Sequence, residues 1–383
     1  MKNKIFCLLT AIVLLAALVS GCVQGIAPMN AGDDDEQTVV FTQGDAAGSE
    51  ASNETAEISE TIEDEMKDAA SEQPDETEVP VSGQPGETET PAPEQLAVAL
   101  SQGEVSALPG GEFIPAEFDV RVGKSDAEMD VVTVDNVKDF VAAIRPNREI
   151  RMVPGVYDLS EADTDGLSEY ASVLGGQLNI TGVENLSILG ADDGSTELVT
   201  DSRFAYLINF EQCREIIVDK ITAGHTPSDY ECDAGVFQFR ECEKVMVSKC
   251  HLYGCGALGI ELWSCNGFIG YANRIDDCSL RALSLSGSHN ALFIDCQFVD
   301  NRAYADVIFA YASDAVFMGC EISGNRQLTW VLIDGMNSVL RFYECSIYNN
   351  SALDGYEWPV PMLEAGGVYE FYDCDMYDNT FSD

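Results

Sequence analysis

The sequence is poor in basic residues. Its 383 residues include 20 Lys and Arg but 66 Asp and Glu, which gives a formal net charge of −46. Nucleic acid is bound through clustered positive charge that neutralises phosphates, so this composition excludes nucleic-acid binding. The part of the chain from residue 113 onward has 17 basic and 44 acidic residues, and it would repel polyuronates unless calcium bridged them.

The sequence also lacks the cysteine spacing of a zinc site. Thirteen cysteines are present, but none forms a C-x2-C pair, and Cys250, His251 and Cys255 have no plausible second pair of ligands. We therefore predict no metal thiolate site. Eleven cysteines follow residue 113, an odd number for an exported domain, and we expect buried thiols rather than disulfides.

The N-terminus has the features of an export signal. Residues 1–21 begin with a short basic region and continue with an apolar run that is too short to favour a membrane span. The run ends in Val-Ser-Gly-Cys22, which resembles the lipobox of bacterial lipoproteins, where cleavage before the cysteine leaves a thiol for a diacylglycerol anchor. The resemblance implies lipidation of Cys22 and an exported protein anchored to the bacterial cell membrane, facing outward. An ordinary secretory signal is the alternative.

Residues 22–112 have too little apolar surface to fold. Between residues 23 and 112 there are 22 acidic residues and one basic residue, Lys67, and Pro, Thr, Ser, Gln and Gly fill much of the rest. Like charges at this density repel one another and extend the chain, so we predict a disordered acidic linker. It would either tether the following domain away from the membrane or serve only as a solvated spacer.

The domain assigned to residues 113–383 has clear helical periodicity in one place. Apolar residues repeat at the spacing of one helix face from Val137 to Ile144, behind the possible cap Asp135, and predict a helix at 134–144. Short β-branched and aromatic runs separated by Gly, Asn and Asp follow, which is typical of an all-β domain.

These strand-like runs repeat with a period of 23 to 29 residues. The repeat is clearest in three columns of small side chains. The first is Cys250, Asn273, Cys296, Cys320, Cys345 and Cys374; the second is Cys255, Cys278, Asn301, Asn325, Asn350 and Asn379; the third is Cys213, Cys242, Cys265, Ser288 and Ser313. A period of this length without intervening helices predicts a parallel β-solenoid in which residues one period apart stack. Stacked Asn would hydrogen-bond along the axis, and stacked Cys would fill the interior.

With these features, the region from about 130 to 383 resembles the right-handed parallel β-helix, pectin-lyase-like superfamily. The features are the single helix, the opening strand run 150–159 and the repeated pattern of strand, Cys and Asn. The resemblance implies an all-β, right-handed parallel β-helix solenoid with an N-terminal capping helix, preceded by a disordered acidic stalk. Members include polysaccharide lyases, glycoside hydrolases, esterases, binding proteins and adhesins, so the fold alone assigns no reaction.

Catalytic motifs of two enzyme groups within this superfamily are missing. The R-x-x-P-x-x-R pattern of pectate lyases is absent, and the Arg-Pro-Asn-Arg run at 145–148 does not match it. Of the polygalacturonase motifs, Asp276-Asp277 and Gly224-His225 supply fragments, without Asn-Thr-Asp or Arg-Ile-Lys. No catalytic residue of these families therefore carries over to this chain.

One outward face of the predicted solenoid has the composition of a sugar-binding surface. Aligning the repeats gives two adjacent outward columns, Asn209, Gln238, Glu261, Ser284 and Phe309 beside Glu211, Arg240, Trp263, Ser286 and Tyr311. An aromatic ring covers the apolar C–H face of a sugar while polar groups bond its hydroxyls. The predicted substrate-binding residues are Gln238, Arg240, Glu261, Trp263, Phe309, Tyr311 and, from neighbouring loops, Tyr230 and Trp358.

Two repeats are longer than the others and place extra residues in loops, at 225–233 and 354–358, that we expect to overhang this face. If the chain is an enzyme, the acid or base candidates are Glu261, Asp233 and His225, with Arg240 stabilising charge. The alternate carboxylates Asp229, Glu231 and Asp233 also suit calcium, although a solvated acidic loop explains them equally. Structural roles remain open too, with Trp263 and Tyr311 packed beneath a loop and Glu261 paired to Arg240.

The hypothesis from sequence is a lipid-anchored, surface-displayed β-helix protein that recognises a neutral or basic glycan on this outward face. The alternatives are a polysaccharide lyase or glycoside hydrolase, and a non-catalytic adhesin or scaffold that binds a protein. No cofactor is expected, with calcium as the open exception, and the sequence defines no oligomeric state.

Overall fold

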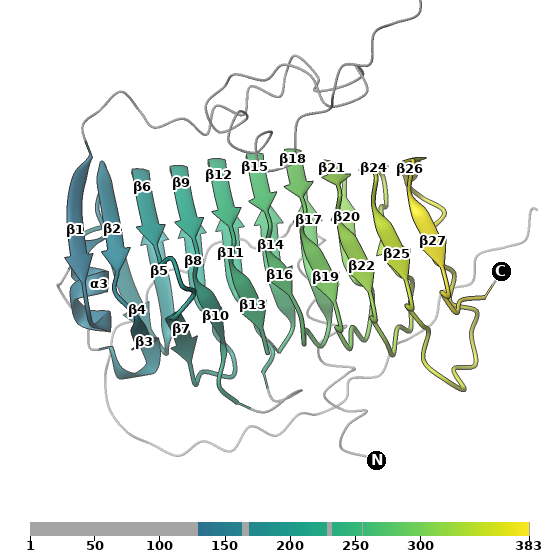
Figure 1. Cartoon of the computed structure of the whole chain (residues 1–383), viewed down its shortest axis with the longest axis horizontal. Helices are drawn as coiled ribbons and strands as arrows, with labels where there is room; N and C mark the ends of the chain where they lie inside the picture. The colour runs from purple at the N-terminus through teal and green to yellow at the C-terminus, as the bar shows by residue number, and fades with distance from the viewer. Residues whose placement is uncertain (1–128, 163–167, 228–231, 255, 383) are drawn as a thin grey trace, which may run out of the picture. The chain divides into compact units, whose positions relative to one another are not determined.

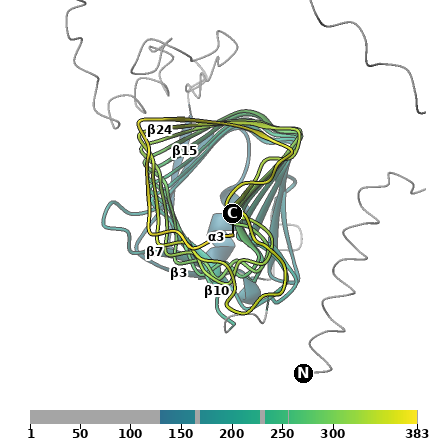
Figure 2. The ribbon, with the colours of Figure 1, turned by 90° about the vertical axis from the view of Figure 1, so that its right-hand side faces the viewer.

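The computed structural model describes residues 129–162, 168–227, 232–254 and 256–382. Successive strands coil into a solenoid walled by three sheets (Figures 1 and 2). Equivalent strands of adjacent coils pair in parallel, as in the pairing of Asn266 with His289 one period later. The structure therefore confirms the all-β parallel β-helix that the repeat predicts.

The described residues form sheets of ten, nine and eight strands, here called sheets A, B and C. Sheet A contains β1 (Asp130–Val134), β2 (Arg148–Met152), β6 (Glu184–Leu189), β9 (Arg214–Asp219), β12 (Glu243–Ser248), β15 (Asn266–Tyr271), β18 (His289–Ile294), β21 (Asp314–Met318), β24 (Val339–Tyr343) and β26 (Val368–Tyr372). Sheet B contains β3 (Gly155–Asp158), β7 (Thr196–Thr200), β10 (Thr222–His225), β13 (His251–Tyr253), β16 (Arg274–Ile275), β19 (Gln297–Val299), β22 (Glu321–Ser323), β25 (Ser346–Tyr348) and β27 (Asp375–Tyr377). Sheet C contains β4 (Ala171–Leu174), β5 (Gln177–Thr181), β8 (Ile208–Glu211), β11 (Phe237–Arg240), β14 (Leu258–Trp263), β17 (Arg281–Ser286), β20 (Ile308–Tyr311) and β23 (Ile333–Asp334).

The coils turn through single residues in the left-handed backbone region. Ser264, with φ of 53°, lies between β14 and β15, and Ala272, with φ of 51°, follows β15. A residue with a Cβ is disfavoured in this conformation, so these turns need compensating interactions. Residues of the predicted small-side-chain columns follow directly, namely Cys265 after Ser264 and Asn273 after Ala272.

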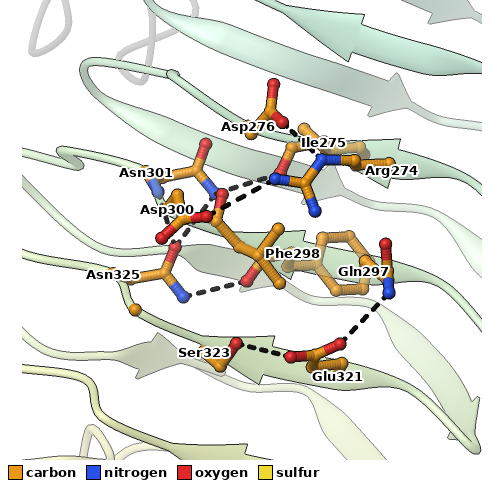
Figure 3. A network of polar contacts seen from close by, with 12 residues as sticks. Arg274, Ile275, Asp276, Gln297, Phe298, Asp300, Asn301, Glu321, Ser323 and Asn325 are labelled. Atoms are coloured by element: carbon orange, nitrogen blue, oxygen red, sulfur yellow. Dashed lines mark hydrogen bonds and ion pairs between the residues drawn. The ribbon is translucent and has the colours of Figure 1, made fainter.

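The predicted asparagine ladder supplies such interactions. The backbone N and Nδ2 of Asn301 both donate to Oδ1 of Asn325 at 3.0 Å, and Asn325 Nδ2 donates to Asn350 Oδ1 at 2.8 Å. Asn325 Nδ2 also donates to the carbonyl of Phe298 at 2.9 Å, so side chains of one coil satisfy backbone groups of the preceding coil (Figure 3). Because these groups are buried, leaving them unpaired would be costly.

Phenylalanine rings and thiols fill the interior. Phe317 stacks between Phe293 and Phe342, with ring centroids 5.0 Å and 4.7 Å away. The ladder cysteines among the described residues are thiols, as the sequence predicts, and burial raises the pKa of the Cys320 thiol. A protonated thiol behaves as a small apolar side chain, which suits the interior.

The helix α3 (Val137–Ala143) lies within the predicted range, between β1 and β2, and a 3-10 helix, η1 (Leu159–Glu161), follows β3. The cap is Asn136 rather than Asp135, because the Asn136 side chain accepts the N–H of Asp139 at 2.9 Å. Phe140 and Val141 are buried, and Figure 2 shows α3 behind the last coils, toward the blue end of the solenoid.

The predicted signal peptide at 1–21, with Cys22, and the linker at 22–112 lie outside the described residues. Within the described ranges, no helix has the length and apolar character needed to cross a bilayer.

Candidate functional site

The outward face of sheet C carries the two columns expected from the repeat alignment. Strand pairing places Asn209, Gln238, Glu261, Ser284 and Phe309 in register, and likewise Glu211, Arg240, Trp263, Ser286 and Tyr311. The name sheet C strip is used below for Gln238, Arg240, Glu261, Trp263, Phe309 and Tyr311. The sequence prediction of which residues share this face is therefore confirmed.

Glu261 is held by two hydrogen bonds in the middle of the strip. Its Oε2 accepts the hydroxyl of Tyr206 at 2.7 Å and the Nε2–H of Gln238 at 2.5 Å. Tyr206 precedes β8, and sequence reasoning did not identify it because its ring reaches across two coils. The carboxylate is half-buried and fixed in orientation, which is the arrangement required for a directional hydrogen bond to a ligand hydroxyl.

The aromatic members of the second column face solvent. Trp263 retains 40% of its surface and Tyr311 retains 44%, so these rings are not packed beneath a loop of the described chain. The Arg240 guanidinium lies 5.8 Å from the centroid of the Trp263 ring, whereas Glu261 bonds to Tyr206 and Gln238 rather than to Arg240, the alternative partner considered from the sequence. The exposed rings leave broad apolar surfaces beside a cation and a carboxylate.

A buried ion pair adjoins the strip and was missed from the sequence. Arg281 Nη2 lies 3.0 Å from Asp306 Oδ2, and its guanidinium lies 4.4 Å from the centroid of the Phe309 ring. Burial raises the pKa of the Asp306 carboxyl to about 6, an effect that the Arg281 charge opposes and the nearby Asp334 charge increases. The pair lies three residues upstream of Ser284 and Phe309, so extending the column alignment would have found it.

An aromatic pocket continues the strip toward the C-terminal coils. Its volume is about 470 Å³, and its walls include Trp330, Tyr356, Trp358, Pro359, Pro361 and Glu364. Trp330 Nε1 donates to Asp334 Oδ2 at 3.2 Å. Asp334 is in register with Phe309 on the neighbouring strand, which connects the pocket to the first column. Trp358, predicted to bind substrate, retains 72% of its surface. Trp330 was missed because it comes from a coil of ordinary length.

The two described catalytic candidates from the first long loop, His225 and Asp233, differ in their surroundings. His225 was expected in that loop, but it ends strand β10, is buried, and donates from Nε2 to the carbonyl of Ala205 at 2.9 Å. Burial lowers the pKa of His225, so the ring stays neutral and has no open route to a ligand on the outward face. Asp233 is exposed, and its N–H donates to the Arg203 carbonyl at 2.7 Å.

The remaining loop predictions fall outside the described residues. Tyr230, Asp229 and Glu231 belong to the undescribed residues 228–231. Within the described ranges, no group of three or more His, Cys, Asp or Glu side chains is arranged to hold a metal ion.

Sheet B differs from sheet C because its outward polar groups bind one another. Arg274 Nε donates to Asp276 Oδ2 at 2.6 Å, and His251 Nε2 lies 2.9 Å from Asp276 Oδ1. Glu321 accepts from Gln297 at 3.1 Å and from Ser323 at 2.7 Å (Figure 3). The His251–Asp276 and Gln297–Glu321 pairs connect adjacent coils, and the other two lie within one coil, so the face is stabilised by its own side chains rather than arranged around a ligand.

Comparisons with known proteins agree with this architecture. The model of the right-handed β-helix region matches residues 232–383. A pectate lyase from Bacillus sp. N165, solved in complex with trigalacturonate, is similar over 68% of this chain and 86% of its own, at 8% identity and a TM-score of 0.50. The chain has a right-handed parallel β-helix, pectin-lyase-like fold.

More distant β-helix structures have lower scores. A surface adhesin of Streptococcus pneumoniae is similar over 65% of this chain and 80% of the adhesin chain, at 11% identity and a TM-score of 0.42. An alginate lyase from Paenibacillus sp. FPU-7 is similar over 64% of this chain and 99% of the lyase chain, at 9% identity and a TM-score of 0.35. No curated protein sequence matches this β-helix chain.

Proposed function

We propose that this β-helix protein binds a carbohydrate along the sheet C strip and in the adjoining aromatic pocket. The observation that carries the proposal is the row of solvent-facing rings, Trp263, Tyr311 and Trp358, beside the oriented carboxylate of Glu261. Sugars combine apolar C–H faces with hydroxyl groups, and rings beside fixed polar groups complement both.

The charge of the site favours a neutral or basic glycan. Glu261 and Glu364 border the ligand surface, where Arg240 is the cation of the sheet C strip, and the domain from residue 113 onward is strongly acidic. Negative potential of this kind repels polyuronates and attracts amino sugars. The comparison with a pectate lyase supports the fold and does not extend its substrate to this chain.

Binding is tested by migration of the full chain through gels that contain neutral, aminated or uronic polysaccharides, with and without calcium. We expect retardation by a neutral or aminated polymer, and a retarding effect at least tenfold weaker for the Trp263→Ala/Tyr311→Ala double variant. Tyr372→Ala is the matched control, because Tyr372 has a similar exposure of 43% but lies on sheet A. Equal retardation of the two variants would contradict the proposal.

The same incubations distinguish binding from catalysis. New reducing ends would indicate hydrolysis, and ultraviolet absorbance from unsaturated products would indicate elimination. Either product would identify a polysaccharide hydrolase or lyase and would replace the binding function proposed here.

We also propose that the protein is exported and lipid-anchored through Cys22. The support is the basic and apolar N-terminal sequence that ends in Val-Ser-Gly-Cys22. Replacing Cys22 by Ala is expected to move the protein from the membrane fraction to the soluble or unprocessed fraction. Unchanged processing and membrane association in that variant would contradict anchoring.

A further inference from the structure

The outward face of sheet A carries an apolar cluster that is separate from the interior. In β15, Phe268 belongs to the interior stack, so the alternation of side chains along a strand places Ile269 and Tyr271 on the opposite, outward side. Their neighbours on adjacent strands are also apolar. The outer apolar face is defined as Ile269, Tyr271, Leu292, Ile294, Val316 and Met318.

These outward side chains are excluded from water. Ile269 and Ile294 have 0% of their surface exposed, whereas the outward rings Trp263 and Tyr311 on sheet C retain 40% and 44%. The described apolar residues that pack against the outer apolar face are Ile217, Met246, Ala272 and Tyr343, which belong to the same sheet or to the turn that follows β15, and Lys249 Nζ lies 5.6 Å from the centroid of the Tyr271 ring. Neighbours within a sheet do not cover the outward ends of side chains, so a further layer must cover this face.

The cluster has sharp polar limits along the sheet. On its N-terminal side, Ser248 Oγ donates to Asp219 Oδ1 at 2.7 Å. On its C-terminal side, Arg341 Nε donates to Glu370 Oε2 at 2.6 Å. Arg341 is in register with Val316 of the cluster on the neighbouring strand. The apolar surface therefore extends from β9 to β24, roughly 24 Å at about 4.8 Å per strand. A covering segment of similar length is required.

The chain immediately before β1 contains a segment with the required sequence. In Phe118-Asp119-Val120-Arg121-Val122, apolar and charged residues alternate strictly, and Phe113 and Ile114 extend the apolar character. Alternation of this kind gives an extended segment one apolar side and one polar side. Such a segment can cover an apolar face while it presents Asp119 and Arg121 to solvent.

The segment also enters from the correct place and has the correct reach. β1 is the first strand of sheet A, and Val131 is in register with the column that leads to Ile269 through β2, β6, β9 and β12. The seven residues 123–129 span roughly 24 Å when extended, about the distance from β1 to β15. Residues 113–122 span roughly 33 Å more, enough to cross the remaining strands.

We propose that residues 113–122 bind across the outer apolar face as an intramolecular strap, with Val122 against Ile269, Val120 against Leu292 and Phe118 against Val316. The strap covers an apolar patch that would otherwise promote association, and it fixes the point at which the acidic linker leaves the domain. A second copy of the chain is the competing occupant of this face.

Methionine oxidation in the full chain tests the strap. Met318 belongs to the outer apolar face and is 6% exposed, whereas Met336 is 39% exposed and serves as the internal reference. With dilute peroxide and mass spectrometry, the ratio of Met318 to Met336 oxidation rates is expected to rise at least fivefold in Phe118→Asp/Val120→Asp. The matched control Val98→Asp/Leu100→Asp, also apolar positions before β1, is expected to leave the ratio unchanged.

Other results would overturn the proposal. An unchanged ratio in Phe118→Asp/Val120→Asp, or a rise confined to Val98→Asp/Leu100→Asp, would exclude residues 113–122 as the covering segment. Protection of Met318 that disappears on dilution of the wild-type chain would identify a second copy as the occupant. A cooperative thermal unfolding transition like that of the wild type separates a folded strap variant from a misfolded one.

Discussion

Replacing Asn325 by Ala removes a central member of the asparagine ladder. Asn325 Oδ1 accepts two bonds from Asn301, and its Nδ2 donates to Phe298 and Asn350. Two of the partners keep other bonds: Asn301 Nδ2 still donates to the carbonyls of residues 275 and 299, and Asn350 Oδ1 still accepts the N–H of residue 325. The backbone N–H of Asn301 loses its acceptor, whereas the carbonyl of Phe298 still takes part in the pairing of β19 with β22.

The expected destabilisation follows from this one group. A buried unpaired polar group costs about 1 to 3 kcal/mol, so the loss is about 1 to 3 kcal/mol. For a domain of roughly 250 residues this lowers Tm by roughly 2 to 12 °C, which calorimetry measures directly. Asn266→Ala is the control, because Asn266 is exposed and its side chain accepts one bond, from Asn290. A Tm loss in Asn325→Ala no larger than in Asn266→Ala would refute the ladder's role in stability.

Two further predictions concern pH. Because burial raises the pKa of Asp306 to about 6, its contribution to stability is present below its unfolded pKa and is lost as pH rises through about 6. The free energy of unfolding of wild type relative to Asp306→Asn should therefore fall by about 3 kcal/mol between pH 4 and 7, and a constant difference would contradict this. Burial lowers the pKa of His225 in the folded chain. The contribution of this neutral ring to stability is therefore complete above its unfolded pKa of about 6.5 and is lost as pH falls. In His225→Gln, which can keep a donor for the Ala205 carbonyl, the acid-side loss of Tm should be smaller; an unchanged profile would contradict the assignment.

The repeat predicted the coil register because residues one period apart must stack in a parallel solenoid. The ladder of Asn301, Asn325 and Asn350 and the register of Glu261 with Gln238 both follow from that single constraint. Loop and strand limits were less predictable. His225 follows Gly224, a residue that usually signals a turn, but here the glycine leaves space for the Tyr253 ring of the next coil and the strand continues.

The sites that sequence reasoning missed depend on contacts between coils of different length. Tyr206 reaches Glu261 across two coils, and Trp330 and Trp358 line one pocket through loops whose paths no periodicity specifies. The outer apolar face was also hidden in the sequence, because an uninterrupted run such as Leu292-Phe293-Ile294 does not show which side is covered. Continuous apolar runs are typical of strands buried on both faces, and this pattern could have indicated the covering layer.

The most direct test of the proposed function is a crystal structure of the full chain with the polysaccharide fragment that retards it most strongly. We expect the ligand on sheet C, with a sugar ring against Trp263 or Tyr311, a hydroxyl bonded to Glu261 and further units toward Trp358. A ligand bound on sheet A or sheet B, with the sheet C strip empty, would contradict the proposed function.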